Sequence, residues 1–129
     1  MVLQSKYYCF LLLLFCALTK AQNIVFADSN LKTALLQALP SNNVAGTGAV
    51  LGNPWVAFYP ANYVKIDTNN DGEIQQSEAL AITYLQIANY SITNFGGIEN
   101  FINLKFLLTN NNPIVSINLS ALNQLEVLL

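Results

Sequence analysis

The most constraining feature of the sequence is the stretch Asp67–Glu78, in which oxygen-bearing side chains recur at fixed intervals. They occupy positions 1, 3, 5 and 12 of these twelve residues, with a glycine at position 6 and an aliphatic residue at position 8. A calcium ion takes six to eight oxygen ligands at about 2.3–2.6 Å, and a loop of this length closed by a bidentate glutamate supplies them. The spacing therefore predicts a calcium site.

Each position of this loop has a predicted role. The expected ligands are the side chains of Asp67, Asn69 and Asp71, the backbone carbonyl of Glu73, the side chain of Gln75 (directly or through water) and both carboxylate oxygens of Glu78. Gly72 permits the sharp turn that the loop needs, and Ile74 is expected to point into the core. An ordinary turn also collects Asp, Asn and Gly, but it requires neither the glutamate nor the aliphatic residue.

The twelve residues resemble the loop of an EF-hand, or of its relative the dockerin module. Residues 77–81 are expected to continue as a turn or a short helix, whereas Pro60 argues against a regular long helix leading into the loop. The sequence therefore predicts a solitary loop rather than a full helix-loop-helix. Its calcium affinity is expected in the extracellular range, with Kd of about 10⁻⁵ to 10⁻³ M.

Residues 1–21 are typical of a secretory signal peptide. Lys6 precedes an apolar run, Tyr7–Leu18, and small residues at Thr19 and Ala21 suit a cleavage site. The run is too short to span a bilayer, although an uncleaved membrane anchor is an alternative. We therefore expect a secreted protein, without a membrane span after cleavage. Both cysteines lie in this segment, which excludes disulfides and zinc thiolates from the exported chain.

The composition of residues 22–129 narrows the classes of function. Three lysines oppose seven acidic residues, a net charge of −4, and four of the seven acids lie in the loop. Without a basic patch, nucleic-acid binding is not expected. The chain has no histidine, and no pair of carboxylates lies outside the loop, so we do not expect an enzyme. A small domain without disulfides gains stability from a bound metal, which predicts a structural ion.

The chain before the loop predicts one helix and one irregular region. Asp28 offers an N-cap, and apolar residues recur at helical spacing up to Leu39, where Pro40 should end the helix. Residues 41–63 carry so many Gly, Asn and Pro residues that they are expected to form loops. The aromatic residues there are Trp55, Phe58, Tyr59 and Tyr63. We expect them to fill a small core rather than line a carbohydrate site.

The chain after the loop contains a repeat. Residues 82–92 align with residues 104–114 at an offset of 22, and a third copy opens at Leu125 with an offset of 21. Within the first copy, Leu85 and Ile87 should face inward on a short strand, while Gln86 and Ala88 face outward.

These units resemble leucine-rich repeats, whose pattern is L-x-x-L-x-L-x-x-N-x-L. The resemblance implies that Asn112 hydrogen-bonds backbone groups at the turn after its strand; Tyr90 and Thr109 depart from the pattern. A calcium loop running into such repeats resembles secreted proteins of Bacteroidetes-type bacteria, which implies that the protein is extracellular or held at a bacterial cell surface. The likeness covers Ile66–Leu129 and is absent from Ala45–Tyr63. In that family the array continues, so we expect this chain to be a fragment.

Together, these features predict an α/β fold. We expect a signal peptide (1–21), a helical cap with an aromatic loop region (22–66), the calcium loop (67–78) and the start of a leucine-rich-repeat solenoid (79–129). The predicted function is a calcium-stabilised, monomeric module that binds a protein or a surface glycan through its repeat face. The alternatives are a dockerin-like docking module, which requires a second loop, and the N-terminal part of a larger secreted enzyme.

Overall fold

The computed structural model describes residues 21–53 and 57–129. The predicted signal peptide, apart from Ala21, and the side chain of Trp55 lie outside these ranges. Within them, no helix combines the length and the apolar character that crossing a bilayer requires.

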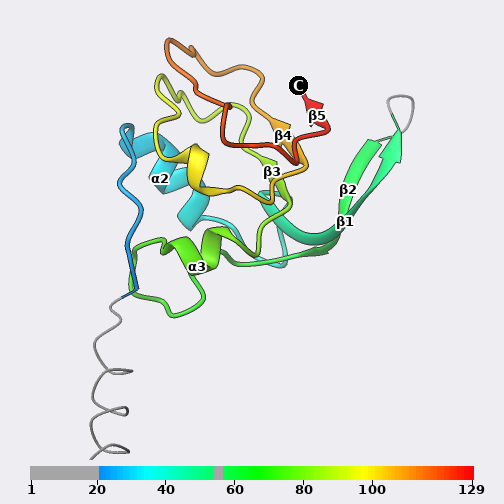
Figure 1. Cartoon of the computed structure of the whole chain (residues 1–129), viewed down its shortest axis with the longest axis horizontal. Helices are drawn as coiled ribbons and strands as arrows, with labels where there is room; N and C mark the ends of the chain where they lie inside the picture. The colour runs from blue at the N-terminus through cyan, green and yellow to red at the C-terminus, as the bar shows by residue number, and fades with distance from the viewer. Residues whose placement is uncertain (1–20, 54–56) are drawn as a thin grey trace, which may run out of the picture.

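A single five-stranded sheet dominates the structure (Figure 1). Its strands are β1 (Ala45–Asn53), β2 (Ala57–Tyr63), β3 (Tyr84–Gln86), β4 (Phe106–Leu108) and β5 (Val127–Leu128), and their order in the sheet is β2-β1-β3-β4-β5. The β1–β2 and β1–β3 pairs are antiparallel, whereas β3–β4 and β4–β5 are parallel. The sheet is therefore mixed.

The antiparallel part of the sheet is a long hairpin that extends to one side of the molecule (Figure 1). A Cβ on Gly46 would overlap the ring of Pro60, so only glycine allows the two strands to approach this closely. The register shifts between Thr47 and Val50, where the pairing is irregular. Pro60 lies in an edge strand, where a missing N–H is tolerated.

This hairpin contradicts the predicted fold class. The expected helical cap followed by a leucine-rich-repeat solenoid in an α/β fold is wrong, because residues 21–53 and 57–129 form a β-dominated fold in which α2 is the one substantial helix. Residues 45–53 and 57–63, predicted as loops, form the two longest strands. The segments that connect the parallel strands contain one short 3₁₀ turn, Ile98–Asn100, and are otherwise irregular.

The parallel part of the sheet follows the spacing seen in the sequence. Tyr84 pairs with Phe106 at an offset of 22, and Phe106 pairs with Val127 at an offset of 21. The side chain of Asn112 binds four backbone groups, as expected. Its Oδ1 accepts from the N–H groups of Tyr90 and Ile92, and its Nδ2 donates to the carbonyls of Ile87 and Thr109.

The expected helix before the loop is present as α2 (Ser29–Leu36), with Asp28 as its N-cap. It ends earlier than predicted: the N–H of Ala38 donates to the carbonyl of Leu35, and the N–H of Leu39 donates to Asn42 Oδ1 instead of continuing the helix. The short helix after the loop is α3 (Gln76–Ala79).

One hydrophobic core joins these elements. It combines the inner face of α2, the inward side chains of β3 and β4 and the residues that flank the loop; its largest members include Leu31, Leu35, Ile66, Ile74, Leu85, Ile87, Phe95, Phe101 and Leu107. On the opposite face of the sheet, Tyr84 and Phe106 stack with their ring centroids 4.6 Å apart. Phe58 packs on Phe106, and Tyr63 meets Tyr84 edge-on. Phe58 and Tyr63 are half-buried against this aromatic pair, while Tyr59 is exposed.

Candidate metal centre

The loop Asp67–Glu78 contains the start of helix α3 and is anchored by two buried aliphatic side chains. Ile66 precedes it, and Ile74 at position 8 is fully buried, as predicted. Gly72 has a φ of +77°, and Asn70 has a φ of 62°. Because most residues avoid this left-handed region, the two residues give the loop its sharp turn.

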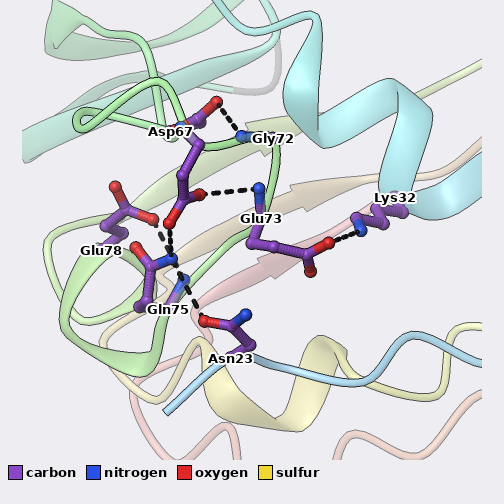
Figure 2. Close-up of polar contacts among 8 residues, drawn as sticks. Asn23, Lys32, Asp67, Gly72, Glu73, Gln75 and Glu78 are labelled. Atoms are coloured by element: carbon purple, nitrogen blue, oxygen red, sulfur yellow. Dashed lines mark hydrogen bonds and ion pairs between the residues drawn. The ribbon is translucent and has the colours of Figure 1, made fainter. Parts of the chain in front are cut away.

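Asp67, at position 1, is held by the backbone of the loop that it begins. Its carboxylate accepts hydrogen bonds from the N–H groups of Asp71 and Gly72, both at 3.2 Å, and the residue is 5% exposed. Figure 2 shows this carboxylate directed toward Gly72. The negative charge therefore lies inside the turn.

Glu78, at position 12, closes the loop. Its Oε1 accepts from the N–H and the hydroxyl of Thr68 at 2.7 and 2.8 Å, and its Oε2 accepts from the N–H of Gln75 at 3.0 Å. The bond to Gln75 is half of a capping box that begins α3. Glu78 is 8% exposed, so a second carboxylate is nearly buried at this site.

Asp71, Asn69 and Gln75 form the polar centre of the loop. Asp71 Oδ2 accepts from Asn69 Nδ2 at 3.0 Å and from Gln75 Nε2 at 2.8 Å. The backbone N–H of Glu73 is the largest cause that lowers the pKa of the Asp71 carboxyl; desolvation raises that pKa by less, and the two amide side chains lower it further. Asp71 is therefore a carboxylate at neutral pH and available to a cation.

The side chain of Glu73 points out of the loop. It pairs with Lys32 of α2 at 2.6 Å, as Figure 2 shows. This leaves only the backbone carbonyl of Glu73 for the ion, which is the role predicted for position 7. Lys65 likewise contacts the side chain of Asn70.

Asn23 belongs to this site, although it is not among the residues predicted from the sequence. Gln75 Nε2 donates to Asn23 Oδ1 at 3.2 Å, and the backbones of the two residues form an antiparallel bridge. The two residues are 52 positions apart, and no motif surrounds Asn23 that would have indicated the contact.

The buried carboxylates lack a cationic partner within the described residues. The ion pairs found there join Lys32 to Glu73 and Lys105 to Glu126, and neither includes Asp67 or Glu78. A cavity of about 330 Å³ adjoins Thr68 and Glu78, on one side of the loop. Buried charge without a counterion is costly, so this arrangement favours the binding of a cation.

In the described ranges, no three His, Cys, Asp or Glu residues are grouped closely enough to hold a metal. The carboxylates instead accept hydrogen bonds from the loop's own N–H groups. Of the six predicted ligand residues, three contribute an Asn side chain, a Gln side chain and a backbone carbonyl. All the predicted ligand atoms are oxygens. This set fits a hard cation such as calcium rather than a transition metal, which prefers nitrogen or sulfur.

Comparison of the chain with protein-family models, with curated proteins and with solved structures finds no significant match.

Proposed function

We propose that the loop Asp67–Glu78 binds one calcium ion and that this ion is structural. The observation that carries the proposal is the pair of nearly buried carboxylates, Asp67 and Glu78, at the two ends of a loop with calcium-binding spacing. The bound ion would neutralise the charges of Asp67, Asp71 and Glu78. It would replace hydrogen bonds that these carboxylates accept in the structure.

The position of the loop explains why an ion would stabilise the whole molecule. Lys32 joins it to helix α2, Ile74 joins it to the core, and α3 begins within it. Fixing the loop therefore fixes three parts of the structure relative to one another. Calcium is abundant outside cells, so an ion site of modest affinity would stay filled in a secreted protein.

As a wider role, we propose a secreted module that binds a protein or glycan partner. The supporting feature is a largely apolar cavity of about 390 Å³ beside the aromatic stack, over the outer face of the sheet. It is lined by Ala57, Phe58, Tyr84, Gln86, Phe106, Leu108, Val127 and Leu129. Tyr84 and Phe106 are themselves buried, so a partner would contact the rim of this cavity rather than stack on those two rings.

Thermal unfolding with and without calcium tests the ion proposal. Binding to the folded state alone stabilises it by about 2.7 kcal/mol at a calcium concentration of about 100 times Kd. For a domain of this size, that corresponds to a rise in Tm of about 10 °C at about 10 mM calcium. The Glu78→Gln variant should lose most of this rise, because Gln offers one neutral oxygen in place of a bidentate carboxylate.

The matched control is Glu126→Gln, which makes the same change of charge at an exposed side chain outside the loop. It should show the wild-type rise. A Tm that is unaffected by calcium in the wild type, or an equal rise in the two variants, would contradict the proposal.

A further inference from the structure

The segment Gln22–Ile24 forms part of the wall of the predicted calcium site. The N–H of Ile24 donates to the carbonyl of Ile74 at 2.8 Å, and the N–H of Gln76 donates to the carbonyl of Gln22 at 3.0 Å. These bonds flank the antiparallel bridge between Asn23 and Gln75. Figure 2 shows the segment passing along the loop with the Asn23 side chain directed at Gln75.

The contact with Asn23 fixes the orientation of a predicted ligand. Gln75 is 2% exposed, and its Nε2 donates to both Asn23 Oδ1 and Asp71 Oδ2. These two acceptors place the amide nitrogen on their side, and Oε1 accepts a hydrogen bond from Nδ2 of Asn69 at 3.2 Å. Without them, the amide could turn over and present N–H groups to a cation.

Ion binding would increase the importance of this contact. Asp71 is a predicted ligand, so its carboxylate would turn to the ion and withdraw from Gln75 Nε2. Asn23 Oδ1 would then be the remaining acceptor for a buried N–H group. A contact that stabilises the calcium-bound state more than the calcium-free state increases calcium affinity.

We propose that Asn23 is a positioning residue for Gln75, so that calcium binding and the docking of residues 22–24 on the loop are energetically linked. This inference rests on the proposed calcium site. By reciprocity, calcium should hold the segment more firmly against the loop, and loss of the Asn23 amide should weaken calcium binding.

Calorimetric titration of the wild type, Asn23→Ala and Asn23→Asp with calcium tests this linkage. We expect Asn23→Ala to bind about fivefold more weakly, which corresponds to the loss of one typical hydrogen bond. Asn23→Asp keeps an acceptor oxygen at the same place and should bind at least as tightly as the wild type. Asn123→Ala, an exposed asparagine near the other end of the chain, is the matched control and should leave Kd unchanged.

A second measurement separates linkage from a general loss of stability. Calcium should slow hydrogen exchange at the amides of Ile24 and Gln76 in the wild type, and by less in Asn23→Ala. Equal Kd values for the wild type and Asn23→Ala would overturn the linkage but leave the calcium site intact. A wild type without saturable calcium binding would overturn both proposals.

Discussion

At the scale of single residues, one side chain can stabilise two parts of the fold, of which the sequence predicts only one. Asp28 is the predicted N-cap of a helix, and its Oδ1 does accept from the N–H of Asn30 at 2.8 Å. Its Oδ2 also accepts from the N–H and the hydroxyl of Thr93, at 2.7 and 2.9 Å. One carboxylate therefore begins α2 and ties it to a loop 65 residues away.

These hydrogen bonds predict an acid-dependent loss of stability. Hydrogen bonds lower the pKa of Asp28 from an ordinary 3.8 to about 2, and the one from the N–H of Thr93 is the largest cause. A carboxyl with a depressed folded-state pKa contributes stability that is full above its unfolded-state pKa and is lost as the pH falls through its folded-state pKa. The contribution of Asp28 should therefore be complete above about pH 4 and disappear toward about pH 2.

Urea unfolding of the wild type and Asp28→Asn across this range measures the effect. The asparagine of the variant is not ionisable, so the wild type should be the more stable protein at neutral pH, and its advantage should shrink between about pH 4 and pH 2. A difference in unfolding free energy that stays constant with pH would contradict this role of Asp28.

At the scale of elements, the hairpin marks the limit of what local signals predict. Glycine and proline in residues 45–63 indicate loops, because both residues usually interrupt regular structure. In the folded chain, Gly46 provides room for Pro60 on the facing strand, and that contact is not visible in either residue's own neighbourhood. Pairing across the hairpin therefore overrides the local preference.

Enlarging Gly46 tests whether this close approach holds the hairpin together. Gly46→Ala should destabilise the protein by about 1–3 kcal/mol, the usual cost of overpacking a tight site. Ala49→Val enlarges an exposed residue of the same strand and should have little effect. Urea unfolding gives both values.

A double-mutant cycle makes this test specific. Combined with Pro60→Gly, the alanine at position 46 should cost less than it does alone, since the clashing ring is gone. Additive effects of the two substitutions would show that Gly46 and Pro60 do not interact.

The loop and the repeat are more predictable than the hairpin, because their signals are local. Gly72 has the positive φ that the turn requires, Ile74 is buried, and the 22-residue offset recurs as the pairing of β3 with β4. The offset does not determine the fold, however. The predicted solenoid does not form, because the sheet is mixed and is extended by an antiparallel hairpin.

At the scale of the whole molecule, the predicted ion lies where separate parts of the chain meet. The loop contacts helix α2 through Lys32, the segment before that helix through Asn23, and the core through Ile74. An ion at this junction would act as a cross-link in a small domain that the sequence leaves without disulfides. The stability of the molecule should therefore depend on one calcium ion bound at this loop.

Calorimetric titration of the metal-free wild-type protein with calcium is the direct test of this ion. We expect saturable binding of one ion per chain, with Kd of about 10⁻⁵ to 10⁻³ M, and no comparable binding by Glu78→Gln. Absence of saturable binding up to about 10 mM calcium, well above that range, would contradict a calcium site at this loop, as would equal binding by the wild type and Glu78→Gln.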